Sequence, residues 1–260
     1  MKVLIACEES QAITKEFRKL GHEAYSCDLL PCSGGHSEWH FQDDCIEVAN
    51  GWFDMNEVTI NNNFALKFDV WSDKNEYEYK QHRIRQIGWN WDLMIAHPPC
   101  TYLALSGNRW LYNKDGSKNK ERWQNQAKAL NFVRALMDAP VKRIAIENPM
   151  SVISSQIRKP DQIVQPWMFG DKAQKSTCLW LKNLPLLKPT DIVDKGEFIE
   201  FVDKNGKKKK QPLWYYEALR QAKTTEERRT LRSKTFKGMA KAIAEQWSDF
   251  SNYSEQKSLF

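Results

Sequence analysis

The stretch DLMIAHPPCTYLALSG, from Asp92 to Gly107, and the stretch RIAIENPMSVI, from Arg143 to Ile153, decide the fold of this chain. Each starts as an apolar run with strand character and continues into a polar segment that contains proline, which predicts a strand ending in a turn. Ligands bind at the carboxyl ends of strands in open α/β sheets, so Cys100 and Glu147 are expected at one such edge. A thiol and a carboxylate placed together favour covalent chemistry on a ring that the carboxylate can hydrogen-bond.

The amino-terminal sequence predicts a βαβ unit. Residues 1–7 are typical of a strand, residues 12–20 of a helix that Gly21 ends, and residues 24–27 of a second strand that ends at Asp28. The alternation continues with an amphipathic helix over 117–137 and strands over 93–96, 143–146 and 177–181. This order of elements predicts a doubly wound α/β fold with a mostly parallel sheet.

Length and composition limit the class of protein. The chain has 260 residues, enough for one α/β domain with a small appendage. No apolar run approaches the roughly 18 residues that span a bilayer, and the amino terminus resembles a strand rather than a signal sequence. The six cysteines lack the spacing of a disulfide framework. We therefore expect a soluble, cytoplasmic protein with free thiols, and a monomer.

The charge pattern favours a polyanionic partner. The net charge is +6, the lysines at 207–210 form a continuous run, and further Lys and Arg residues follow between 220 and 241. A solvated loop explains the lysine run equally well. Eleven tryptophans are unusual, and several lie in polar surroundings, among them Trp110, Trp123 and Trp214. Such residues suit base stacking, and they also suit packing at the edge of a core.

The two opening stretches together resemble the catalytic motifs of DNA cytosine-C5 methyltransferases, a Pro-Pro-Cys loop followed by Glu-Asn-Val. In this chain the corresponding residues are His97-Pro98-Pro99-Cys100 and Glu147-Asn148-Pro149, and Thr101 stands where the family usually has Gln. The chain looks closest to the compact members of the family that bacteriophages carry. The resemblance implies S-adenosylmethionine as the cofactor on a Rossmann-like sheet, double-stranded DNA as the partner, and a bacterial host cytoplasm as the location.

The resemblance also implies a role for each motif residue. Cys100 would attack C6 of a cytosine that has been flipped out of the duplex. Glu147 would hold the ring through N3 and the exocyclic amine and would protonate N3, with Asn148 orienting the carboxylate or its loop. Pro99 would stiffen the loop beside Cys100, and Pro98 would do the same where the loop borders the cofactor.

The expected cofactor site lies around the first turn. Asp28 follows that turn by about twenty positions and resembles the acidic residue that binds the cofactor ribose, although an Asp that caps the next turn is an equally good interpretation. The family has Phe-x-Gly-x-Gly where this chain has Ala6 to Ser10 without glycine, and there Glu8 would bind the cofactor's amine. Asp44, with Ile46, is the nearest match to an Asp-Ile pair that contacts the adenine.

The resemblance divides the chain into three parts. Residues 1–185 are expected to form the catalytic domain, with an insertion at 49–88 that includes a hairpin turning at 61–63. Residues 186–230 form a small basic segment for DNA recognition, in which Lys207 and Lys208 would contact DNA. Gln174 and Lys175 resemble a degenerate Gln-x-Arg-x-Arg element and are also expected at the DNA. Residues 231–260 would close onto the catalytic domain through a helix over 235–247.

A second cluster of residues suggests a metal site. Cysteine and histidine at intervals of four or five can bind zinc, and the cluster comprises Cys27, Cys32, His36, His40 and Cys45. The spacing lacks the tight pair of ligands that zinc knuckles have, and Gly34-Gly35 interrupts it. We interpret the segment as a polar loop near the cofactor and predict no metal.

Two other functions remain open at this point. The missing glycines and the degenerate segment at Gln174 are consistent with a catalytically inactive, nucleic-acid-binding relative. The small recognition segment is consistent with a thiol-dependent enzyme that transfers a one-carbon group to C5 of a free pyrimidine nucleotide.

Overall fold

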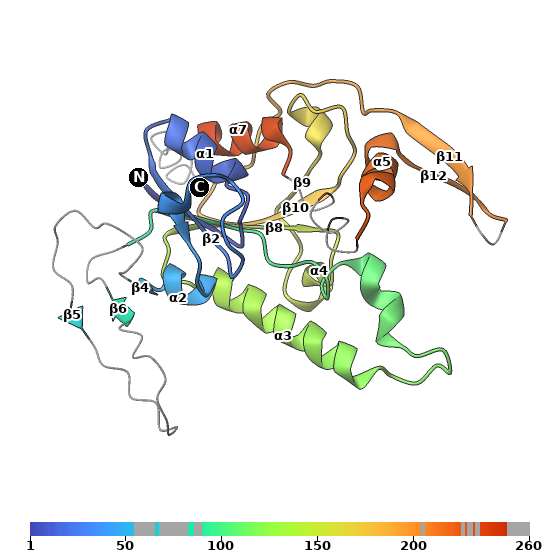
Figure 1. The fold of residues 1–260 in the computed structure, drawn as a ribbon, viewed down its shortest axis with the longest axis horizontal. Coiled ribbons are helices and arrows are strands. Elements are labelled where there is room, and N and C mark those ends of the chain that lie inside the picture. The colour runs from blue at the N-terminus through green and yellow to red at the C-terminus, as the bar shows by residue number, and fades with distance from the viewer. Residues whose placement is uncertain are drawn as a thin grey trace, which may run out of the picture.

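The structure is a computed structural model, and it describes residues 1–54, 66–67, 83–85, 90–203, 206–224, 227, 231 and 235–248. Within 52–89 only the backbone of these residues is described. Its main sheet has seven strands in the order β3-β2-β1-β7-β8-β10-β9 (Figure 1). All pairings are parallel except those of β10, which runs antiparallel to β8 and β9. The bounds are β1 Lys2–Ala6, β2 Glu23–Cys27, β3 His40–Phe41, β7 Leu93–Ala96, β8 Arg143–Pro149, β9 Gln162–Val164 and β10 Thr177–Lys182.

Helices cover both faces of this sheet. One face packs against α1 Ala12–Lys19 and α7 Lys237–Gln246, and the other packs against α2 Cys45–Ala49 and α3 Lys120–Met137. The doubly wound, mostly parallel α/β fold expected from the sequence is therefore confirmed. The other helices among the described residues lie in the segments that join these elements: η1 Ser37–Trp39, η2 Leu105–Leu111, α4 Ile153–Gln156, η3 Pro166–Met168 and α5 Leu213–Gln221. None of the helices that the structure describes is long and apolar enough to cross a membrane.

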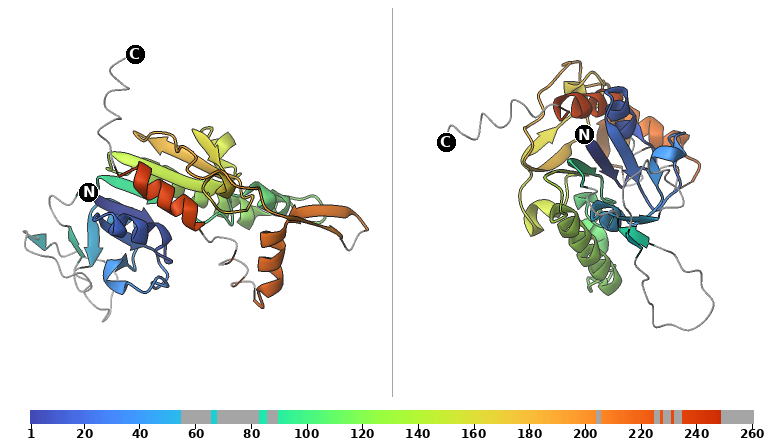
Figure 2. Two further views of the ribbon diagram at one scale, coloured as in Figure 1. Left: turned by 90° about the horizontal axis from the view of Figure 1, so that it is seen from above. Right: turned by 90° about the vertical axis from the view of Figure 1, so that its left-hand side faces the viewer.

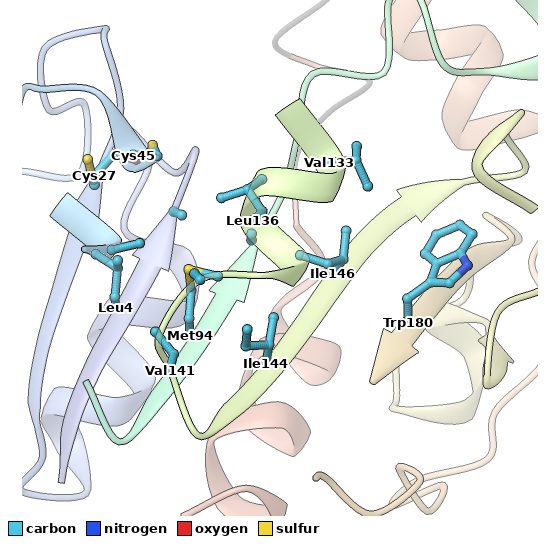
Figure 3. Close-up of a cluster of buried hydrophobic side chains, with 14 of the residues drawn as sticks. Leu4, Cys27, Cys45, Met94, Val133, Leu136, Val141, Ile144, Ile146 and Trp180 are labelled. Carbon is cyan, nitrogen blue, oxygen red and sulfur yellow. Dashed lines mark hydrogen bonds between the residues drawn. The ribbon is translucent and has the colours of Figure 1, made fainter. Parts of the chain in front are cut away.

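Alternate residues of the central strands enter two separate cores, because successive side chains of a strand point to opposite faces. In β1, Leu4 belongs to the core under α2 and α3, whereas Val3 belongs to the core under α1 and α7. Figure 3 shows the first of these cores, where Met94 and Ile146 of the sheet face Leu136 of α3. Burial on both faces explains why these strands are continuously apolar in the sequence.

Strand β8 differs from its prediction in one way that matters for the site. The predicted strand ended at Ile146 and left Glu147 in a turn, but β8 continues to Pro149. It continues because β10 pairs with it antiparallel along that length, with Leu179 opposite Glu147 and Thr177 opposite Pro149. The sequence predicted β10 as a strand without its direction, and it did not predict β9.

Two smaller sheets lie outside the main one. β4 Trp52–Asp54, β6 Arg83–Arg85 and β5 Leu66–Lys67 pair in that order within the predicted insertion. The hairpin turn expected at 61–63 lies outside the described residues. β11 Phe198–Val202 and β12 Lys208–Pro212 form an antiparallel hairpin that leads into α5. Figure 2 shows this hairpin projecting away from the main sheet.

The C-terminal helix α7 lies against α1, as Figure 1 shows. Met239, Ile243 and Trp247 of α7 are buried in the same core as Val3. Gly238 allows the helix to dock closely, because a Cβ at this position would come within 1.7 Å of the Phe169 carbonyl oxygen. The contact positions α7 over the centre of the sheet.

We predict that Gly238→Ala lowers the free energy of unfolding by about 1–3 kcal/mol, as overpacking does. Helix propensity alone predicts the opposite, a gain of about 1 kcal/mol for alanine. Urea denaturation measures the difference, and Lys241→Ala, at an exposed position of the same helix, serves as the control. A Gly238→Ala protein as stable as the wild type would show that α7 does not dock in this way.

Candidate active site

The candidate site lies at the carboxyl ends of β1, β7 and β8. β1 and β7 are adjacent and parallel, and the chain proceeds outward from them in opposite directions, through β2 on one side and β8 on the other. The carboxyl ends of such a pair form the crevice in which doubly wound folds bind ligands. The backbone N–H of His97 donates to the Ala6 carbonyl at 2.9 Å, which holds the two strand ends together.

The two sequence motifs are joined directly by hydrogen bonds. Asn148 Nδ2 donates to the Pro98 carbonyl at 2.8 Å. Beyond it, the Leu105 N–H donates to the Met150 carbonyl at 3.0 Å, and the Val152 N–H donates to the Leu103 carbonyl at 2.9 Å. The segment that carries Cys100 and the segment that follows Glu147 therefore form one rigid unit, although about fifty residues separate them.

Cys100 is exposed at the turn that follows β7. Pro98 before it is buried and Pro99 is exposed, and the Cys100 carbonyl accepts the N–H groups of Leu103 and Ala104. The turn thus presents the thiol to solvent on a backbone that is fixed from both sides.

Helix α3 holds the next part of the loop. Arg122 Nη2 donates to the Thr101 carbonyl at 2.8 Å, and Gln126 Nε2 donates to the Tyr102 carbonyl at 3.0 Å. Gly107 makes room for the first contact, because a Cβ there would come within 2.8 Å of Arg122 Nη2. Neither Arg122 nor Gln126 was predicted to belong to the site. The sequence signal for Gln126 is a polar residue on the inner side of an amphipathic helix.

Glu147 forms a buried pair with His97. His97 Nδ1 lies 2.8 Å from Glu147 Oε2, and the two side chains are only 14% and 15% exposed. Burial raises the pKa of Glu147, but the hydrogen bond and charge of His97, with the charge of Lys175, outweigh it and lower that pKa. Burial lowers the pKa of His97, but the hydrogen bond and charge of Glu147, with the charge of Glu8, raise it overall. His97 belongs to the motif His97-Pro98-Pro99-Cys100, but its position in the sequence predicts no role for it.

Three buried polar atoms of the site have no hydrogen-bond partner among the described residues: His97 Nε2, Asn148 Oδ1 and Ser151 Oγ. Buried polar groups are nearly always satisfied, so these atoms of the two motif segments are candidates for contact with a ligand. Both a nucleobase and the amino-acid end of a cofactor have groups that would satisfy them.

The acidic residues of the expected cofactor site cap local structure. Glu8 is buried and accepts the Ile13 N–H at 2.7 Å and the Thr14 hydroxyl at 2.7 Å, so it caps the start of α1. Burial raises its pKa, which the charge of His97 and the bond from Ile13 oppose. Asp28 accepts the Leu30 N–H at 2.9 Å, and Asp44 accepts the Ile46 N–H at 2.7 Å. Their roles toward a cofactor stay predictions.

The first turn takes the shape that glycine usually allows without containing any glycine. Cys7 has a φ of 60° and Gln11 a φ of 57°, both in the left-handed region. Gln11 is secured by its side chain, which donates to the His36 carbonyl and accepts the His36 N–H. The backbone therefore makes a tight turn in which Cys7 and Gln11 occupy left-handed positions that usually favour glycine.

Three thiols meet beside this turn. Cys7 Sγ lies 3.8 Å from Cys45 Sγ, and the Cys7 N–H donates to the same sulfur. Hydrogen bonds from the thiols of Cys27 and Cys7 lower the pKa of Cys45 to about 4, against its burial. Each of these cysteines is a free thiol in the structure.

The histidines of the suspected zinc cluster lie in other contacts. His36 pairs with Glu38 at 3.0 Å, and His40 bonds to Ser26 and to the Leu30 carbonyl. Across the residues whose placement is described, no group of three or more His, Cys, Asp or Glu side chains is arranged to hold a metal ion.

Two projecting segments carry exposed aromatic and basic side chains. In η2, Trp110 is 55% exposed, and the Arg109 guanidinium lies 4.7 Å from the centre of its ring. In the β11–β12 hairpin, Lys207 and Lys208 are exposed, and Lys210 lies 5.2 Å from the ring centre of Phe198. Figure 1 shows both segments at the end of the molecule toward which β8 runs.

Gln174 and Lys175 lie close to the motifs, in the connection that enters β10. The Gln174 carbonyl accepts Trp214 Nε1 at 3.2 Å, which attaches α5 to this connection. Lys175 is near enough to Glu147 for its charge to lower the pKa of that carboxylate. Contact of either residue with DNA stays a prediction.

Comparison with known proteins gives little detail. No family model matches the sequence, and no curated protein matches it. The fold is similar to a solved E. coli structure, a "putative DNA modification methyltransferase" encoded within a prophage, with 12% identity and a TM-score of 0.38. The similarity covers 75% of this chain and 52% of the other, so this chain spans about half the length of that protein. A likeness of this degree concerns general architecture and not the side chains of the site.

The buried pair should make the stability depend on pH. Because the pKa of His97 is raised, its contribution to the stability of the folded protein is complete below the ordinary pKa of 6.5. This contribution is lost as the pH rises through the pKa that His97 has in the folded protein. Because the pKa of Glu147 is lowered, its contribution to the stability of the folded protein is present above the ordinary pKa of 4.5. This contribution is lost as the pH falls through the pKa that Glu147 has in the folded protein. We predict that His97→Asn lowers the unfolding free energy by about 2 kcal/mol near pH 5.5 and by less at pH 9. Urea denaturation of both proteins across this range measures the difference, and a constant difference would contradict the pairing.

Proposed function

We propose that this chain is an S-adenosylmethionine-dependent enzyme that methylates C5 of cytosine in DNA through a covalent adduct with Cys100. The observation that carries the proposal is the joining of the two motifs by the hydrogen bond from Asn148 to Pro98. It fixes an exposed thiol and a buried carboxylate on one edge of the sheet. These are the two groups that addition to a pyrimidine ring needs.

The roles of the two groups follow from the chemistry of cytosine. C5 is a poor nucleophile until a thiolate adds at C6, which moves electron density to C5 and N3. Glu147 holds the ring at N3 and supplies the proton that N3 takes up, so it stabilises charge where charge develops. Asn148 keeps the Cys100 loop in place through the Pro98 carbonyl.

The unpartnered polar atoms and the tight first turn fit a cofactor with an amino-acid end and a ribose. We expect Ala6, Glu8, Asp28, Asp44 and Pro98 to hold it, with Asp28 binding the ribose. When bound, S-adenosylmethionine supplies the methyl group.

A polymeric substrate is favoured over a free nucleotide by the two projecting segments. Exposed Trp110 beside Arg109 offers a stacking surface, and Lys207 and Lys208 offer charges for phosphates. A free nucleotide needs neither. The target base must leave the duplex to reach Cys100.

We predict that the protein forms a denaturation-resistant adduct with duplex DNA containing 5-fluorocytosine when S-adenosylmethionine is present. The fluorine cannot leave C5 as a proton does, so the bond between Cys100 and C6 persists. Denaturing gels and mass spectrometry of the cross-linked peptide measure it. Cys100→Ala should abolish the adduct, and Cys32→Ala, a control at another thiol, should leave it unchanged.

Other outcomes select the alternatives. DNA binding without any adduct would indicate a catalytically inactive relative, and labelling of 5-fluoro-dCMP but not of DNA would indicate an enzyme for free nucleotides. An adduct that survives Cys100→Ala would move the nucleophile to another thiol.

A separate prediction tests the cofactor site. Asp28→Ala should raise the dissociation constant for S-adenosylhomocysteine about ten- to hundredfold, because two ribose hydroxyls lose their acceptor. Calorimetric titration measures it. Asp115 also caps a turn, through the Ser117 N–H at 2.9 Å, so Asp115→Ala controls for the loss of a cap. Lower stability with unchanged affinity in Asp28→Ala would leave Asp28 as a turn cap only.

A further inference from the structure

Glu147 has to give a proton to N3, yet its surroundings favour the ionised carboxylate. His97 hydrogen-bonds to it at 2.8 Å and Lys175 adds a second positive charge, and together they lower the pKa of Glu147. An ionised carboxylate can accept a hydrogen bond from the exocyclic amine of cytosine, but it has no proton for N3. The proton has to come from a group in contact with Glu147.

His97 is the group with that contact. Its Nδ1 faces Glu147 Oε2, and the ring is mostly buried, so bulk water does not compete for the bond. The charged groups around the ring are Glu147 from β8, Glu8 from the turn after β1, and Lys175 from the connection before β10. Two carboxylates against one ammonium favour the imidazolium, in spite of burial.

We propose that His97 is a positioning residue that holds the proton which Glu147 passes to N3 of the pyrimidine. This role rests on the proposed function. It gives the buried His97–Glu147 pair a task beyond stability, and it assigns the position before Pro-Pro-Cys a part in the reaction.

The Cys100 thiolate donates an electron pair to C6 and forms the S–C6 bond. The C5–C6 double bond shifts to C4–C5, and the C4–N3 pair moves onto N3. His97 Nδ1 gives its proton to the ionised Glu147, and the carboxyl group formed in this way gives one proton to N3. The imidazolium becomes imidazole, and the carboxylate ends as it began. The reverse movement restores the proton when the adduct collapses.

The role makes a specific prediction for pH dependence. In the wild type, activity requires one proton on the pair, and this proton is lost as the pH rises through the folded pKa of His97, which is raised from 6.5. In His97→Asn, the amide still donates a hydrogen bond to Glu147 but carries no transferable proton. The carboxyl group of Glu147 then has to hold the proton alone, and Lys175 opposes this. The alkaline limb should therefore move to lower pH.

The test uses exchange of the C5 hydrogen, which needs addition of Cys100 and protonation at N3 but no cofactor. Duplex DNA labelled with tritium at C5 of cytosine is incubated with the full-length protein from pH 5 to 9, and release to water is counted. We expect His97→Asn to exchange about tenfold more slowly or worse at pH 8, with a smaller loss at pH 6. Glu147→Gln should be slow at every pH. His36→Asn, at the exposed His36–Glu38 pair, should match the wild type.

The outcomes separate this role from the proposed function. If the wild type exchanges and His97→Asn either matches it or is slower by the same factor at every pH, the proton-holding role is overturned and the proposed function stands. Exchange in none of the proteins, wild type included, overturns both. A measurement without substrate covers the case in which His97→Asn does not fold. Nuclear magnetic resonance of the His97 ring should show a pKa above 6.5 that Glu147→Gln lowers, and a wild-type value below 6.5 overturns the role.

Discussion

The antiparallel pairing of β10 with β8 is the constraint on which the site depends. β7 has its last partner at Ala96, opposite Ile146, whereas β10 keeps β8 extended through Glu147 and Asn148 to Pro149. Because successive residues of a strand point to opposite sides, Glu147 and Asn148 reach different neighbours from one rigid backbone. Glu147 meets His97, and Asn148 binds the Pro98 carbonyl. The loop that carries Cys100 is thus aligned by a strand and not by its own sequence.

The electrostatics of the site follow from the same arrangement. His97 lies at the point where the strand order reverses, between the carboxylates of Glu8 and Glu147. A buried ion pair gains little net stability over apolar packing, and removing one partner is costly. Glu8 accepts hydrogen bonds from Ile13 and Thr14 at the start of α1, whereas Glu147 is bonded to His97. Position in the sheet therefore gives these two carboxylates different partners.

The sequence predicted the central part of the fold well, because continuous apolar strands and an amphipathic helix have strong periodic patterns. It also paired Cys100 with Glu147, since both follow strands of one sheet. It placed Glu147 in a turn, because pairing with a distant strand such as β10 leaves no local signal at a Glu-Asn-Pro sequence. His97 was missed for a related reason: its importance comes from a contact with a residue fifty positions away. Asp28 was predicted either to bind a ribose or to cap a turn; the structure shows the cap, and the ribose contact stays a prediction.

The difference between a strand-borne carboxylate and a loop-borne thiol has a consequence for how the chain can vary in evolution. An insertion or deletion between β7 and η2 would displace Cys100 directly. The same change beyond Pro149 would leave Glu147 unmoved, because its place is set by the ladder with β10. Relatives of this chain should therefore keep a fixed length on the thiol side and tolerate variable length on the carboxylate side.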